Sequence, residues 1–118
     1  MKSGELGRKG EAIAAKYYLN RGCRLLAHNF KTRQGELDLV LLDGETVVIA
    51  EVKTRTEVQR MRPAEAVGAV KQQRLILATQ LFLQQNRLQD RTIRFDVVEV
   101  LPGASGWQVH CIKNAFEV

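Results

Sequence analysis

The sequence predicts an α/β domain in which a mixed β-sheet is flanked by helices. A helical segment opens the chain, three strand-like segments follow, and a second helical segment separates them from two more strands. A strand that reaches its neighbour through a helix lies parallel to it, almost always in a right-handed crossover. Strands joined by short turns lie antiparallel. The 118 residues suffice for one domain, 1–118, and are too few for two.

Two segments carry the apolar period of a helix. The first spans residues 5–21 and ends before Gly22, and its apolar side chains share one arc. Glu11 lies in the middle of that arc, which is an unfavourable place for a solvating acid. The second spans 63–86, with a short turn followed by a long helix from about Val70. It has two apolar stripes, so one can pack on the sheet while the other covers the first helix or forms the face of a homodimer.

Five segments are predicted as strands because they are apolar or alternate with a period of two residues. They are residues 23–30, 36–42, 46–54, 91–101 and 106–112. The second and third flank an Asp-Gly pair at residues 43–44, which is a strong signal for a hairpin. The order of segments then places the fourth strand parallel to the third, beside an antiparallel meander of the first three.

Charged side chains interrupt the two most apolar strands. If residues 43 and 44 form the turn, Glu36 lies opposite Glu51 and Asp38 lies opposite Ile49. Asp38 and Glu51 are then diagonal neighbours on one face of the sheet. Lys53 shares the face of Glu51, because side chains alternate along a strand. Without a partner, such charges would be costly in a buried strand.

A divalent cation would relieve the repulsion between two neighbouring carboxylates. Mg²⁺ is commonly held by one or two carboxylates, with water and substrate phosphate filling the other positions. Lys53 beside them could orient or deprotonate an attacking water, or stabilise charge on a phosphate. Glu11 could reach the same cluster from the first helix. In the alternative interpretation, these residues line a solvated sheet edge and form weak surface ion pairs.

The triplet Glu51-Val52-Lys53, preceded by Asp38, resembles the PD-(D/E)-x-K signature of restriction-endonuclease-like nucleases. Leu37 stands where the name of the motif has proline. The whole chain resembles the bacterial YraN-type family, which is similar to archaeal Holliday-junction resolvases. The segments that carry this resemblance are GRKGEAIAAKYY (7–18), NFKTRQGELDLVLLDG (29–44), VVIAEVKTR (47–55) and AEAVGAVKQQRLILATQLFL (64–83).

The resemblance implies a restriction-endonuclease-like core of helix, three strands, helix and strand, to which this chain adds a terminal strand. It implies that Asp38 and Glu51 bind Mg²⁺ or Mn²⁺, that Glu11 completes the metal cluster, and that Lys53 serves the nucleophilic water. The implied activity is a metal-dependent phosphodiesterase, an endonuclease acting on DNA, with branched or structured DNA among the candidate substrates.

The charge of the chain also favours a nucleic-acid partner. The formal net charge is +5 and the isoelectric point is near 9.6, which is typical of proteins that bind polyanions. A basic rim around the acidic residues is predicted from Arg33, Arg55, Lys71 and Arg74. Two alternatives remain: a non-catalytic nucleic-acid-binding module with the same fold, and an interaction protein whose acidic cluster is only structural.

Other classes of site and location are disfavoured. Cys23, His28, His110 and Cys111 would point to different faces of their strands, so they cannot form the usual tetrahedral zinc set. Two cysteines do not make a disulfide framework. No apolar run is long enough to span a membrane, and the N-terminal residues lack the apolar stretch of a signal peptide. We therefore expect a cytoplasmic protein.

Overall fold

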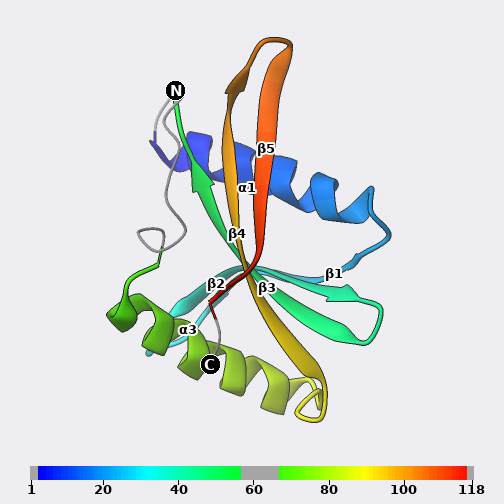
Figure 1. Cartoon of the computed structure of the whole chain (residues 1–118). Helices are drawn as coiled ribbons and strands as arrows, with labels where there is room; N and C mark the ends of the chain where they lie inside the picture. The colour runs from blue at the N-terminus through cyan, green and yellow to red at the C-terminus, as the bar shows by residue number, and fades with distance from the viewer. Residues whose placement is uncertain (1–2, 57–66, 117–118) are drawn as a thin grey trace.

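A computed structural model of the chain describes residues 3–56 and 67–116. Five strands form one sheet in the order β1-β2-β3-β4-β5, and two long helices pack on it (Figure 1). The elements are α1 Ser3–Leu19, β1 Arg24–Lys31, β2 Glu36–Asp43, β3 Thr46–Thr54, α3 Ala69–Gln85, β4 Thr92–Gly103 and β5 Gly106–Phe116. The first three strands are antiparallel, β4 is parallel to β3, and β5 is antiparallel to β4. The predicted α/β class and mixed sheet are confirmed.

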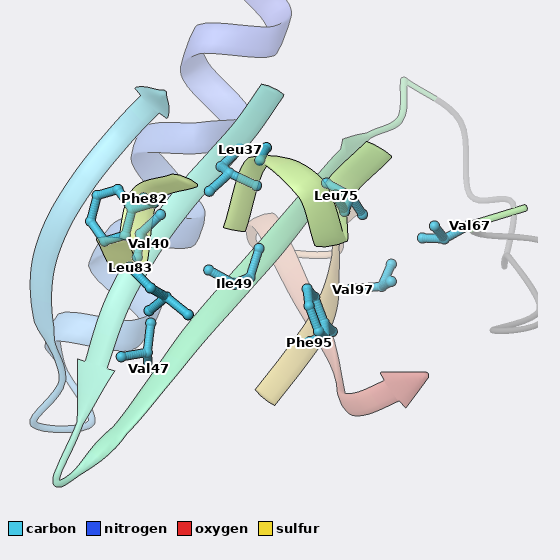
Figure 2. Packing of buried hydrophobic residues seen from close by; sticks show 11 residues of the cluster. Leu37, Val40, Val47, Ile49, Val67, Leu75, Phe82, Leu83, Phe95 and Val97 are labelled. Carbon is cyan, nitrogen blue, oxygen red and sulfur yellow. The ribbon is translucent and has the colours of Figure 1, made fainter. Parts of the chain in front are cut away.

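The two helices cover opposite faces of the sheet, and the alternation of β3 shows why. Val47 and Ile49 belong to the core beneath α3, whereas Val48 and Ala50 belong to the core beneath α1. Successive side chains of a strand point to opposite faces, so a fully apolar strand needs a cover on both sides. Figure 2 shows Leu75 and other α3 side chains over the first of these cores.

Helix α1 approaches the sheet closely at Gly10. A Cβ atom on Gly10 would overlap the Thr54 Oγ1 atom of β3, so only glycine lets the helix come this near. The helix ends at Leu19, two residues before the predicted end, and Gly22 follows with φ of +86°. Glycine tolerates this left-handed conformation, which is common just after a helix.

The turn between β2 and β3 differs from the predicted one by one residue. Asp43 pairs with Thr46, so the turn residues are Gly44 and Glu45. Gly44 has φ of +61°, and Glu45 does not have a positive φ. This is the pattern of a type II′ turn, which takes glycine at its first central position. Asp43 stays in the strand, where its Oδ2 atom accepts a hydrogen bond of 3.1 Å from Arg94.

The predicted pairing of Glu36 with Glu51 and of Asp38 with Ile49 was therefore wrong. Ile49 pairs with Val40, and Glu36 pairs with Lys31 of β1. The turn shift moves each partner by two positions, and a shift of two keeps every side chain on its own face. The inference that Asp38 and Glu51 share a face thus survives the error in register.

Helix α3 uses one of its two apolar stripes to cover the sheet. Its buried residues are Leu75, Ala78, Thr79, Phe82 and Leu83. The other stripe is open at Val70 and Leu77, which are 70% and 39% exposed. It does not cover α1, because α1 lies on the opposite face of the sheet. A role in a homodimer stays a prediction, and the first residues of the predicted segment, 63–66, lie outside the described ones.

Candidate catalytic groove

An open groove runs between the start of α3 and the end of the β2–β3 pair. Its volume is about 1230 Å³. Residues of the β1–β2 turn, β2, β3 and α3 line it, and its charged residues are Lys31, Arg33, Glu36, Asp38, Glu51, Lys71 and Arg74. The groove therefore has two acids from the predicted motif in its wall and four cations around them.

The walls of the groove are held together by a tight turn and a close approach. The Thr32 hydroxyl accepts hydrogen bonds from the N–H groups of Gln34 and Gly35, at 3.1 and 2.9 Å. A Cβ atom on Gly35 would lie 2.7 Å from the backbone oxygen of Arg74. Glycine thus allows the turn to touch the backbone of α3, and this contact sets the distance between the two walls.

Asp38 lies where β2 and β3 begin to separate. The last pair before it is Leu39 with Ala50, so the register continues to a position opposite Glu51. Its Oδ2 atom accepts a hydrogen bond of 2.9 Å from the Val52 N–H. Burial and the charge of Glu51 raise the pKa of Asp38 to about 7, although the Val52 bond acts in the other direction. Two carboxylates close enough to repel are thus present on one face.

Glu51 is the most enclosed charge of the groove, with a side chain that is 6% exposed. Its Oε1 atom lies 2.5 Å from the Lys71 Nζ atom and 3.4 Å from the Lys53 Nζ atom. One lysine comes from the same strand and the other from the first turn of α3. The buried charge is therefore compensated by two cations, as a buried carboxylate requires.

The two lysines respond in opposite ways to this environment. Burial lowers the pKa of Lys53, the hydrogen bond with Lys71 lowers it further, and the attraction of Glu51 opposes both. Burial also acts to lower the pKa of Lys71, but its hydrogen bonds with Glu51 and Lys53 outweigh burial and raise it. Lys53 is thus the lysine that gives up its proton more readily.

Glu11 lies apart from the groove. It lines a separate hollow between α1 and β1, with Leu39 on the sheet side. Its charge reaches Asp38, since it contributes to raising the pKa of that carboxyl group. Within residues 3–56 and 67–116, no group of three or more His, Cys, Asp or Glu side chains is arranged to hold a metal ion. The role of Glu11 as a third ligand stays a prediction.

Sequence comparison gives the chain a family. A family described as "Uncharacterised protein family UPF0102" matches residues 10–100. The chain belongs to this family. It is 39% identical over 116 residues to a UPF0102 protein of Marinobacter nauticus, covering 98% of this chain and 94% of the relative. A UPF0102 protein of Stutzerimonas stutzeri is 45% identical, covering 94% and 93%.

The assignment to UPF0102 agrees with the YraN-type resemblance of the sequence motifs. The matched region contains Asp38, Glu51, Lys53 and Lys71, so this charged cluster lies within the part of the chain that matches the family.

The predicted basic rim is only partly in the groove of this UPF0102 protein. Arg33, Lys71 and Arg74 line it, whereas Arg55 comes after the end of β3 and donates its backbone N–H to Val100. In addition, Lys71 bonds directly to Glu51 rather than lying only at the rim.

Among the described residues, neither long helix combines the length and the hydropathy that a membrane-spanning helix needs.

A buried polar centre around Asp96 was not predicted. Asp96 of β4 is 1% exposed and accepts hydrogen bonds from the Tyr18 hydroxyl at 2.8 Å, from Arg94 at 3.0 Å and from the Asn114 N–H at 3.0 Å. It lies on the α1 side of the sheet and joins α1 to β4 and β5. An acid inside the apolar run RFDVVEV was the available signal, and it is the same kind of signal that singled out Asp38 and Glu51.

Proposed function

We propose that this protein is a metal-dependent nuclease that cleaves DNA in the groove beneath the start of α3. One observation carries the proposal: Asp38 and Glu51 come from two strands to one face of the groove, with Lys53 beside Glu51. Their closeness helps to raise the pKa of Asp38 to about 7. A divalent cation between two such carboxylates would relieve their repulsion.

The residues present fit a divalent cation that is also held by water and by the substrate. Mg²⁺ prefers hard oxygen ligands and commonly uses only one or two carboxylates, keeping several waters. Asp38 and Glu51 supply those two carboxylates, and the open groove leaves room for water and a phosphate. When bound, the ion would supply Lewis-acid activation of the scissile phosphate and of the attacking water.

The residues of the chain have separate tasks in this reaction. The oxygen of a water molecule bonds to phosphorus, and the bond from phosphorus to the leaving sugar oxygen breaks. Lys53, whose Nζ atom lies 3.4 Å from Glu51, orients the attacking water and stabilises the charge that develops on the phosphate, and the water releases its proton to solvent. The leaving oxygen takes a proton from solvent. Arg33 and Arg74 on the groove wall hold neighbouring phosphates of the strand.

A cleavage panel tests the proposal and identifies the substrate. Linear, flapped and four-way DNA are incubated with the purified protein in Mg²⁺ or Mn²⁺, and the products are resolved on denaturing gels. Glu51→Gln should abolish cleavage, whereas Glu36→Gln, which changes an exposed acid of the same groove, should retain it. Lys53→Ala should lower the single-turnover rate by about 10²- to 10³-fold while changing DNA affinity much less.

The second candidate is a nucleic-acid-binding module that does not cleave. It is favoured by the observation that two lysines already neutralise Glu51. Wild-type protein that binds DNA in the presence of metal but cuts no structure of the panel would support it over the nuclease. Protein that neither binds nor cuts would instead favour an interaction protein whose acidic cluster is structural.

A further inference from the structure

The first turn of α3 has an unusual charge for a helix start. Helix N-termini carry a partial positive charge and are stabilised by acidic side chains or by a side-chain cap. This helix has no acidic residue in its first turn, and its N-cap is Gly68, which has no side chain that could cap the first N–H groups. It carries Lys71 there instead. A lysine at the positive end of the helix dipole destabilises the helix slightly, so we infer that Lys71 serves the groove rather than the helix.

Lys71 meets Glu51 at one of the two carboxylates that would hold a cation. Its Nζ atom lies 2.5 Å from Glu51 Oε1, in the wall that also contains Asp38. Its charge also acts on Asp38, where it lowers the pKa against the effects of burial and Glu51. One ammonium group thus interacts with both carboxylates of the proposed metal site.

We propose that Lys71 is a displaceable counter-ion, which neutralises Glu51 in the metal-free protein and leaves it when a divalent cation binds. The inference rests on the proposed function, because it assigns the cation to Asp38 and Glu51. A cation held by the Glu51 carboxylate and an ammonium group at 2.5 Å from one oxygen of that carboxylate would repel each other, so one would have to move.

The structure indicates which of the two lysines moves. The Lys53 side chain is 23% exposed and extends from the same strand as Glu51, at 3.4 Å. The Lys71 side chain is 45% exposed and reaches Glu51 from another element, across the open groove. A lysine has a flexible four-carbon stem, so Lys71 can swing into the groove without moving the helix. Lys53 stays beside Glu51, where the proposed reaction needs it.

Displacement of Lys71 would couple metal binding to substrate binding. The released ammonium group stays in a wall that already contains Lys31, Arg33 and Arg74, and there it can bind a phosphate oxygen. A phosphate that attracts Lys71 makes Glu51 available to the cation, and by linkage the cation strengthens phosphate binding in turn. The groove therefore binds the divalent cation more weakly when no nucleic acid is present.

Binding of Mn²⁺ alone tests the displacement without any reaction. Isothermal titration calorimetry at about 0.15 M salt, where charges beyond about 8 Å are largely screened, gives the dissociation constant for wild type and variants. Lys71→Met keeps the length of the stem and removes the charge, and it should bind Mn²⁺ at least about fivefold more tightly. Lys71→Arg retains the charge and should stay near wild type.

Arg74→Met is the matched control. Arg74 lies one turn further along the same helix and lines the same groove, so its removal tests the general effect of a nearby positive charge. We expect it to change the Mn²⁺ dissociation constant less than about twofold. The melting temperature adds a second readout. In the presence of chelator, Lys71→Met should have a lower melting temperature than wild type, because Glu51 loses one of its two cationic partners. Saturating Mn²⁺ should reduce this difference in melting temperature.

The outcomes separate the inference from the function on which it rests. Equal effects of Lys71→Met and Arg74→Met, or no effect of Lys71→Met on a wild-type protein that binds Mn²⁺, would overturn the displacement and leave the metal site in place. If wild type binds no Mn²⁺, or if Glu51→Gln binds it as tightly as wild type, the metal site is refuted and the displacement with it.

Discussion

Replacing Asp38 by asparagine should stabilise the metal-free protein at neutral and alkaline pH. The folded protein holds a proton on Asp38 more tightly than the unfolded chain does, since its pKa rises from 3.8 to about 7. Stability from this group is therefore greatest at acidic pH, below the unfolded pKa, and falls as the pH rises toward 7. An asparagine side chain cannot ionise, yet its oxygen can still accept the hydrogen bond from the Val52 N–H.

The magnitude follows from the size of the shift. A rise of about three pKa units corresponds to about 4 kcal/mol when fully expressed, at about 1.4 kcal/mol per unit. Asp38 is only partly buried, so solvent screens part of the repulsion. We expect Asp38→Asn to raise the free energy of unfolding by about 2 kcal/mol near pH 8, and by less than half of that near pH 5.

Urea denaturation in the presence of chelator, followed by circular dichroism at the two pH values, measures this difference. Glu36→Gln is the control, because it removes an exposed acid of the same groove and should change stability by less than about 0.5 kcal/mol. Adding Mg²⁺ to wild type should reduce the advantage of Asp38→Asn, since the ion binds only the native carboxylates. If Asp38→Asn does not raise the free energy of unfolding, or raises it equally at both pH values, the raised pKa of Asp38 is refuted.

Three further predictions concern α1, the buried acid of β4 and the groove wall. Gly10→Ala should lower the free energy of unfolding by about 1–3 kcal/mol, because the added Cβ atom overlaps the side chain of Thr54 in β3. Gly7→Ala is the control and should not destabilise the protein, because no atom lies within 4 Å of the added Cβ. Urea denaturation compares the two variants. Asp96→Ala should lower the free energy of unfolding by about 3–5 kcal/mol, because Arg94 keeps only Asp43 and the Tyr18 hydroxyl loses its buried acceptor. Urea denaturation measures this loss, and a loss below about 1 kcal/mol would contradict the role of Asp96. Arg74→Ala should weaken binding to all DNA sequences alike and reduce the salt dependence by about one unit of slope; sequence-dependent losses in fluorescence anisotropy at several salt concentrations would argue against a phosphate contact.

The periodic features of the fold could be predicted from the sequence alone. The apolar run at 46–54 and the helical period of 5–21 are written locally in the order of apolar residues, which shows how many sides of each element face the core. The parallel placement of β4 beside β3 followed from one helical crossover. The common face of Asp38 and Glu51 could be predicted as well, because a shift of two residues does not change the face.

The tertiary structure decided the contacts between elements. The pair Asp43-Gly44 predicts a turn, but the backbone of Gly44 at the first turn position moved the hairpin by one residue. Lys71 could be placed near the groove by sequence, yet its bond to Glu51 depends on how closely α3 approaches the sheet, which is set at Gly35. Tyr18 and Asp96 lie 78 residues apart and meet only through the packing of α1 on the sheet. Local patterns report which residues are buried, whereas the partner of a buried charge depends on long-range packing that no local pattern contains.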